Sequence, residues 1–214
     1  MLTDIILKGE CRMKSAIKIL EKKKEYRNEI EKVLSKEDCD KLWKKTAARL
    51  NGYLKKYESL SEGVRSHTDE SIFPAAAFYL TAKEYLPQEE AFAVLERAAD
   101  AMCAKARSFL SKMMRIPGAK SGFIKTWDPM TRKKFGPECG FKNKFYPKEK
   151  GAYRMDVLEC PFKKYLTELG CPELTKVFCD NDERVYGSLP GLVFERKGTL
   201  GKGADRCDFY IRKA

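Results

Sequence analysis

The sequence has one histidine, no Cys-x-x-Cys pair and no apolar run long enough to cross a bilayer, which needs about 20 residues. We therefore expect no membrane partner. Its eight cysteines lie at long, irregular intervals, whereas zinc knuckles place cysteines two to four residues apart. We expect no bound metal and no cofactor. Any Ser-His-Asp or Cys-His arrangement would have to use His67, which lies in a polar stretch where an exposed loop histidine is the simpler interpretation.

The N-terminal residues, MLTDIILKGECRMK, lack the basic start and long apolar stretch of an export signal. We therefore expect a cytoplasmic protein. In that compartment eight cysteines are expected to be free thiols rather than disulfides.

The formal net charge of +12 is concentrated in the middle of the chain. Residues 105–154 contain 14 Lys and Arg against 3 Asp and Glu, whereas residues 1–60 contain 16 against 10. A basic segment can attract nucleic acid, anionic lipid or an anionic substrate, or it can simply be solvated. Because no nucleic-acid-binding motif accompanies it, we do not expect nucleic acid as a partner.

Helical spacing of apolar residues predicts helices over about 10–34, from 36 to 57, over 73–85 and over 88–113, with a polar break at 59–71. After residue 120 glycine and proline become frequent, and alternating runs predict strands at 141–146, 153–158, 192–196 and 207–211. Two short helices lie between them, at about 162–169 and 174–178. The pattern predicts an α+β fold, an antiparallel sheet with helices packed on one face. We expect a helical segment, 1–58, and an α+β domain, 59–214.

Three cysteines in ECPFKKYLTELGCPELTKVFCDND, residues 159–182, are candidates for chemistry. Pro161 and Pro172 suit the first turn of a helix, which places Cys160 and Cys171 at or beside helix N-termini. There the helix dipole lowers a thiol's pKa. Either cysteine could be a reactive thiolate, or each could be a small packed residue.

The motif F-C-D-N-D places Cys179 next to two carboxylates, Asp180 and Asp182. Cys179 is expected at the far end of the short helix 174–178, where the dipole disfavours a thiolate. The carboxylates could serve acid/base chemistry. Asp-Asn-Asp is also a common turn sequence.

In the last strand, Cys207 shares a face with Phe209, while Asp208 points the other way. Arg196 shares a face with Leu192 and Phe194, so it either clamps a substrate carboxylate or is solvated at the strand end. The loop GTLGKG lacks the GK[ST] ending of a phosphate-binding loop, and we expect no nucleotide site there.

Several blocks together resemble one known family. They are HTDESIFPAAAFYLTAKEYLPQEEAF, MTRKKFGPECGFKNKF and LECPFKKYLTELGCPELTKVFCDNDERVYGSLPGLVFERKGTLGKGADRCDF. The chain from about residue 60 to 212 resembles the L-2-amino-thiazoline-4-carboxylic acid hydrolases. The resemblance implies hydrolytic opening of a small cyclic amidine that bears a carboxylate, giving N-carbamoyl-L-cysteine. G-x-G-A-D-x-C is also similar, more distantly, to the end of 4-vinyl-reductase-type small-molecule-binding domains, but Thr199 stands where those often have a zinc-binding cysteine.

Such a reaction needs a nucleophile or a base for water, a proton donor, and a cation for the carboxylate. The candidates for the first two roles are Cys160, Cys179, Asp180, Asp182, Asp205 and Cys207; those for substrate binding are Arg196 and His67. The partner expected is a small-molecule carboxylate substrate, and a homo-oligomer stays open. A non-catalytic small-molecule-binding or sensor domain of the same fold is the competing hypothesis, and a basic nucleic-acid-associated protein is the third.

Overall fold

The computed structural model describes residues 15–214, so Cys11 and the start of the helix expected from residue 10 lie outside the described part. The chain forms two compact units. Within the described residues, the first comprises 15–60 together with Arg65–Ala98, and the second comprises Ser61–Val64 and Ala99–Ala214. The division expected at residue 58 stays a prediction. None of the helices within residues 15–214 has the length and apolar character needed to span a bilayer.

The first unit is helical. Its elements are a helix at residues 15–21, α2 (Lys24–Ile30), α3 (Lys36–Lys56), the second half of α4 (Glu62–His67), the π-turn η1 (Thr68–Ile72), α5 (Phe73–Ala82) and the start of α6 (Gln88–Met113). Helix α5 is buried on almost every side, as expected for a helix that is apolar all round, and α3 packs against it. Ser35 caps α3 by accepting a hydrogen bond from the Asp38 N–H at 3.1 Å, the hydrogen bond typical of the capping-box sequence S-K-E-D.

Two helical boundaries differ from expectation. The helix predicted over 10–34 is interrupted at residues 22–23, where the N–H groups of Lys22 and Lys23 bond to carbonyls three residues earlier and end the first helix. The polar break predicted at 59–71 is mostly helical. The Ser61 hydroxyl caps its start by accepting from Val64 N–H at 3.4 Å, and Arg65 and Asp69 form an ion pair one turn apart at 2.9 Å.

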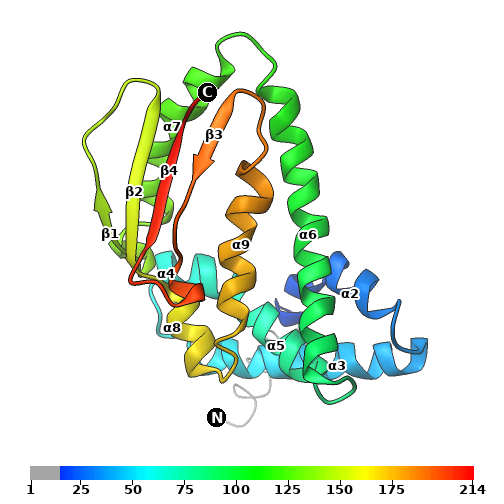
Figure 1. Cartoon of the computed structure of the whole chain (residues 1–214). Coiled ribbons are helices and arrows are strands. Elements are labelled where there is room, and N and C mark those ends of the chain that lie inside the picture. The colour runs from blue at the N-terminus through cyan, green and yellow to red at the C-terminus, as the bar shows by residue number, and fades with distance from the viewer. Residues whose placement is uncertain (1–14) are drawn as a thin grey trace. The chain divides into compact units, whose positions relative to one another are not determined.

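The second unit contains a four-stranded antiparallel sheet, in the order β1-β2-β4-β3. Figure 1 shows the sheet with β4 between β2 and β3. The strands are β1 (Lys142–Phe145), β2 (Ala152–Glu159), β3 (Leu192–Glu195) and β4 (Cys207–Lys213). The predicted α+β fold, helices first and then an antiparallel sheet, is therefore confirmed.

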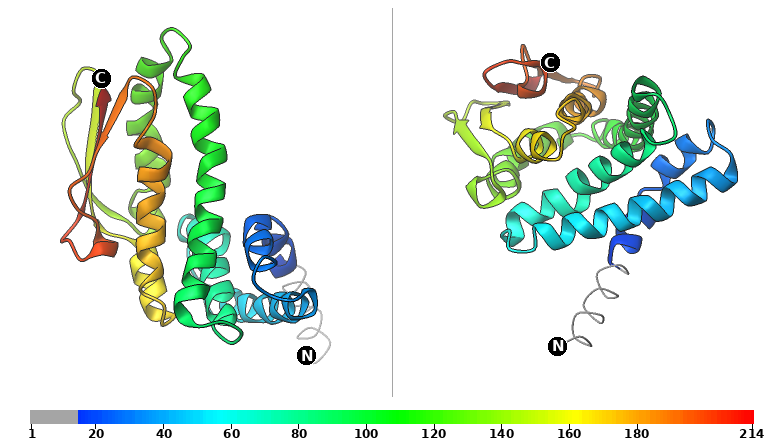
Figure 2. Two further views of the ribbon diagram at one scale, coloured as in Figure 1. Left: turned by 45° about the vertical axis from the view of Figure 1, so that its right-hand side comes forward. Right: turned by 90° about the horizontal axis from the view of Figure 1, so that it is seen from below.

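Helices α7 (Ala119–Lys134) and α9 (Leu174–Tyr186) pack on one face of this sheet, as Figure 2 shows. Trp127 of α7 lies at the centre of the core, with ring centroids 4.8 Å from Phe209 and 5.0 Å from Tyr186. The opposite face is polar: Asp156 of β2 lies directly beside Asp208 of β4. Alternation along β4 thus directs Cys207 toward the helices and Asp208 away from them, as predicted.

The segment between β3 and β4 positions the candidate site. Asp208 accepts hydrogen bonds from the backbone N–H groups of Lys197 (3.0 Å) and Gly198 (2.8 Å), which fixes the start of the segment to β4. The short 3₁₀ turn η3 (Leu200–Lys202) then packs on α9. Helix α8 (Pro161–Glu168) packs against α9, and the turn η2 (Pro137–Cys139) precedes β1.

Candidate functional site

Helix α9 continues past the point where it was expected to end. It runs from Leu174 to Tyr186, so Asp-Asn-Asp lies inside the helix and the turn interpretation is wrong. Arg184 explains part of this, because its guanidinium donates to the Asn181 side chain (3.0 Å) and to the Val177 carbonyl (3.1 Å). Cys179 is therefore in the middle of the helix rather than at its C-terminal end, and the unfavourable end of the dipole does not act on it.

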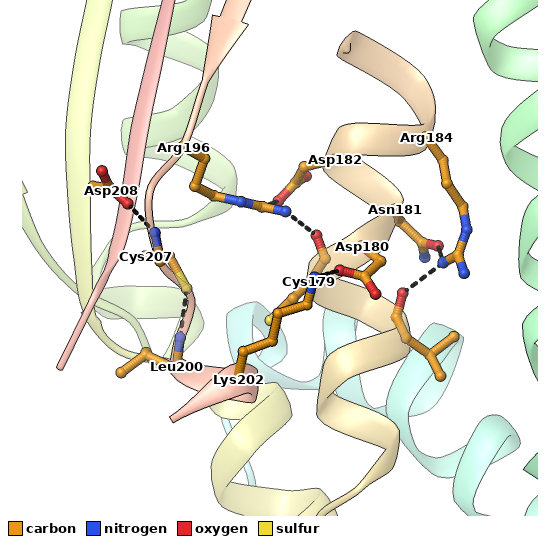
Figure 3. Close-up of polar contacts among 12 residues, drawn as sticks. Cys179, Asp180, Asn181, Asp182, Arg184, Arg196, Leu200, Lys202, Cys207 and Asp208 are labelled. Carbon is orange, nitrogen blue, oxygen red and sulfur yellow. Dashed lines mark hydrogen bonds and ion pairs between the residues drawn. The ribbon is translucent and has the colours of Figure 1, made fainter. Parts of the chain in front are cut away.

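Cys179 and Cys207 form a thiol pair between α9 and β4. The Cys207 thiol donates a hydrogen bond to the Cys179 sulfur, and the Leu200 N–H donates to the Cys207 sulfur at 3.2 Å. Figure 3 shows both side chains reaching into the space between the helix and the strand. Both cysteines are half-buried free thiols. The F-C-D-N-D stretch of α9 thus meets the strand that contains Cys207.

The negative charge of this pair belongs on Cys179. Its sulfur is reached by the Cys207 thiol, the Thr199 hydroxyl and the Gly201 N–H, and together these donors lower the pKa of Cys179 to about 6 against the opposing effect of burial. The Cys207 sulfur accepts one backbone N–H, and its pKa is raised because its proton is shared with Cys179 and because it is buried. Hydrogen bonds to a charged form favour that form, so Cys179 is the thiolate.

Thr199, directly before η3, and Gly201, within η3, bring these donors close to Cys179. The Thr199 side chain is 2% exposed, and its hydroxyl lies near the Cys179 sulfur but makes no hydrogen bond of normal geometry to any residue that the structure describes. Gly201 lies against α9 so closely that a Cβ atom there would be 2.8 Å from the Cys179 sulfur and 2.9 Å from the Thr175 carbonyl carbon. Only glycine therefore allows this approach of backbone to helix.

Asp182 and Arg196 form an ion pair beside the thiols. The Arg196 guanidinium donates to the Asp182 carboxylate (2.8 Å) and to the Cys179 carbonyl (2.7 Å), and its side chain is only 6% exposed. Removal from water raises the pKa of the Asp182 carboxyl to about 6, and Arg196 opposes that rise. Because 42% of the Asp182 side chain is exposed, solvent screens part of both effects. Arg196 is thus held by α9 rather than solvated, and its role as a carboxylate clamp stays a prediction.

Asp180 has a different partner. Its carboxylate pairs with the Lys202 ammonium at 2.5 Å, which ties η3 to α9 a second time. Figure 3 shows the two ion pairs on the same stretch of α9, Asp182 with Arg196 and Asp180 with Lys202. Both charged side chains that follow Cys179 therefore fasten the β3–β4 segment to the helix.

Cys160 is the N-cap residue of α8, as its neighbouring proline predicted, but it is not activated there. Burial raises the pKa of the Cys160 thiol to about 11, and the N–H groups of Phe162 and Lys163 offset only part of this rise. Desolvation therefore exceeds the effect of the helix N-terminus. Cys171 is fully buried and lies before the N-cap of α9, in agreement with packing rather than chemistry.

The remaining candidates do not join the thiol pair. Asp205 is 79% exposed and pairs with the adjacent Arg206 at 3.5 Å. His67, the last residue of α4, belongs to the first unit. The sequence brought Cys179, Cys207, Asp180, Asp182 and Arg196 into consideration, and the structure places these five together. Sequence reasoning missed the hydrogen-bond donors at and just before η3, which are Thr199, Leu200 and Gly201. The one signal for them was the cluster of glycines in GTLGKG.

An open groove of about 570 Å³ lies next to this cluster, on the β3–β4 segment. It is lined by Glu183, Arg196, Lys197, Gly198, Thr199, Lys202, Gly203 and Ala204. A second hollow, of about 480 Å³, lies between α7 and the β1–β2 turn and contains no cysteine, so it is not the better candidate for thiol chemistry. Within residues 15–214 no three His, Cys, Asp or Glu side chains are grouped so that they could hold a metal ion.

The glycine at 201 provides a test of this geometry. We expect Gly201→Ala to push η3 away from α9, because the new Cβ would meet helix backbone that cannot move aside. Loss of the donors would return Cys179 toward ordinary thiol reactivity. Gly203→Ala is the matched control: its Cβ enters open space, and only its φ of +89° adds strain, on the order of 1 kcal/mol. The rate of alkylation of Cys179 at pH 7 should fall in Gly201→Ala and not in Gly203→Ala. Equal rates in both variants would contradict the close packing of η3 on the helix.

One comparison with known proteins identifies a family. No curated protein and no solved structure matches the chain. The family model for L-2-amino-thiazoline-4-carboxylic acid hydrolase matches residues 65–211, which include strands β1 to β3, most of β4, and both Cys179 and Cys207. The chain therefore belongs to the L-2-amino-thiazoline-4-carboxylic acid hydrolase family.

Proposed function

We propose that this protein is a hydrolase that opens the ring of a small cyclic amidine acid, of the 2-amino-thiazoline-4-carboxylate type, with Cys179 as the nucleophile. Family membership suggests the hydrolytic reaction and the substrate class. The observation that most supports the choice of residue is the set of three donors around the Cys179 sulfur. A thiolate that persists at neutral pH is what nucleophilic catalysis by cysteine needs.

In the first step, the Cys179 thiolate adds to the ring carbon that lies between nitrogen and sulfur. The carbon–sulfur bond of the ring then breaks, and the ring sulfur leaves as a thiolate that takes up a proton. The product of this step is an isothiourea, in which the former ring carbon is bonded to Cys179. No oxidant or reductant is involved.

In the second step, water adds to the same carbon and the bond to Cys179 breaks. The carbon keeps the water oxygen as a carbonyl, which gives N-carbamoyl-cysteine and restores the Cys179 thiolate. The sum of the two steps is the substrate plus one water. Splitting a difficult displacement into two easier ones is the general advantage of a covalent intermediate.

Two neighbouring groups suit the proton transfers. The Cys207 thiol already donates to Cys179 and is placed to protonate the departing sulfur. Asp182 lies three residues after Cys179, on nearly the same face of α9, and a carboxyl with a pKa near 6 can accept a proton from water close to neutrality. Cys160, Asp180 and Asp205 have no role in this scheme.

The nucleophile is tested by Cys179→Ser. We expect turnover of 2-amino-thiazoline-4-carboxylate to fall by about 10³-fold or more, since a serine hydroxyl stays protonated where the thiol ionises. Cys139→Ser is the matched control, because that buried thiol donates to the Lys133 carbonyl at 3.5 Å and a hydroxyl can do the same. Release of N-carbamoyl-cysteine and thermal unfolding should both be measured.

Retained turnover in Cys179→Ser would contradict the nucleophile assignment. If the unaltered protein gives no product but its unfolding temperature rises in the presence of the acid, the sensor hypothesis replaces the enzyme.

The thiol pair also predicts the pH dependence. Because the pKa of Cys179 is lowered to about 6, kcat/KM should rise with pH through about 6 and then level off. Cys207→Ala removes a donor to the thiolate, so the rise should move to higher pH, and Cys207→Ser, which keeps a donor, should move it less. If kcat/KM still rises near pH 6 in Cys207→Ala, the group that titrates there is not Cys179 but another one, such as Asp182.

A further inference from the structure

We infer that the groove on the β3–β4 segment binds the carboxylate of the substrate through Lys197 and Lys202, so that these lysines determine specificity for an acid. The inference rests on the proposed function and adds the site that the substrate's anionic end occupies. The sequence led us to expect that Arg196 binds the substrate carboxylate, and the inference assigns that binding to Lys197 and Lys202 instead.

The size and position of the groove fit a small ring acid. Its volume of about 570 Å³ lies within the usual range for small-molecule sites, about 300–1,000 Å³. Three of its lining residues also contact the stretch of α9 that contains the nucleophile. Arg196 binds the Cys179 carbonyl, Lys202 binds Asp180, and Thr199 reaches the Cys179 sulfur. A molecule in the groove therefore lies next to the turn of helix that contains Cys179.

The charges of the groove favour an anion. Its lining contains three cations, Arg196, Lys197 and Lys202, and one acid, Glu183. Arg196 is buried and has both of its terminal nitrogens occupied by Asp182 and the Cys179 carbonyl, so it is already neutralised. The Lys202 ammonium pairs with Asp180 but is 49% exposed, so it has donors left for a second carboxylate.

Lys197 completes the anion site. Its side chain is exposed, while its backbone N–H is fixed by both oxygens of Asp208, at 3.0 and 3.1 Å. The Lys197 side chain therefore starts from an anchored backbone, and it lines the same groove as Lys202. Two ammonium groups that face a carboxylate form charge-assisted hydrogen bonds, the stronger class of such bonds.

Thr199 marks the inner end of the groove. It is 2% exposed and lines the groove, and its hydroxyl, although near the Cys179 sulfur, makes no hydrogen bond of normal geometry to any described residue. A buried hydroxyl without a partner is costly unless a ligand or thiolate satisfies it. A ring whose carboxylate is at the lysines would extend toward Thr199, whose hydroxyl lies near the Cys179 sulfur.

The test compares two ligands that differ only in the carboxylate: 2-amino-thiazoline-4-carboxylate and 2-amino-thiazoline. Both are titrated by calorimetry into Cys179→Ser protein, which does not consume the acid. The variants add Lys197→Gln and Lys202→Gln, singly and together. Lys112→Gln is the matched control, since it removes the same charge from an exposed position on α6 in the same unit.

We expect the double variant to bind the acid about 10 to 100 times more weakly, the range for losing hydrogen bonds to a charged group. Its affinity for 2-amino-thiazoline, which has the ring but no carboxylate, should not fall, and Lys112→Gln should match the parent for both ligands. The inference is overturned if the double variant binds the acid as tightly as the parent. It is also overturned if the parent binds 2-amino-thiazoline as tightly as the acid, or binds no acid. Thermal unfolding of each variant verifies that the unit remains folded.

These outcomes are independent of turnover. If the unaltered protein does not hydrolyse the acid, the proposed function fails, but the binding comparison still decides whether the lysines form a carboxylate site.

Discussion

The close approach of the η3 segment to helix α9 is the constraint on which the candidate site depends. Gly201 touches the helix backbone where a side chain would not fit, and the neighbouring N–H groups and hydroxyl then reach the two sulfurs. Two ion pairs, Asp180 with Lys202 and Asp182 with Arg196, hold the same segment from the helix side. The reactive thiol is thus a property of how a loop packs on a helix, and not of one residue alone.

The activation of Cys179 and the inactivity of Cys160 have the same physical explanation. Both thiols are removed from water, which raises a thiol's pKa. Cys160 has two backbone N–H groups of a helix N-terminus to offset that effect, and they do not suffice. Cys179 has a backbone N–H, a hydroxyl and a second thiol nearby, and these groups lower its pKa by more than burial raises it. The number and kind of donors decide which cysteine ionises, so a helix terminus by itself is a poor guide.

Much of the fold could be predicted from the sequence, because it follows from local patterns. The alternation of apolar and polar residues predicted the four strands. It also predicted that Cys207 and Asp208 point to opposite faces of the sheet. Helix α7 was not predicted, since Gly122 and Pro129 suggest irregular structure, although Ile124, Trp127 and Thr131 repeat at helical spacing. The end of α9 was predicted too early, because Asp-Asn-Asp favours turns locally, while the partners that hold it helical, Arg184 and Arg196, come later in the chain. Contacts of that kind depend on packing, which one-dimensional patterns do not contain.

The central claim is that Cys179 is a thiolate at neutral pH while its neighbours are protonated. Limited alkylation with iodoacetamide at pH 7, followed by peptide mass spectrometry, measures this for each cysteine. We predict that Cys179 is modified first, faster than Cys160 and Cys207 and faster than in the unfolded chain. Modification of Cys160 or Cys207 ahead of Cys179, or a Cys179 rate no higher than in the unfolded chain, would contradict the account.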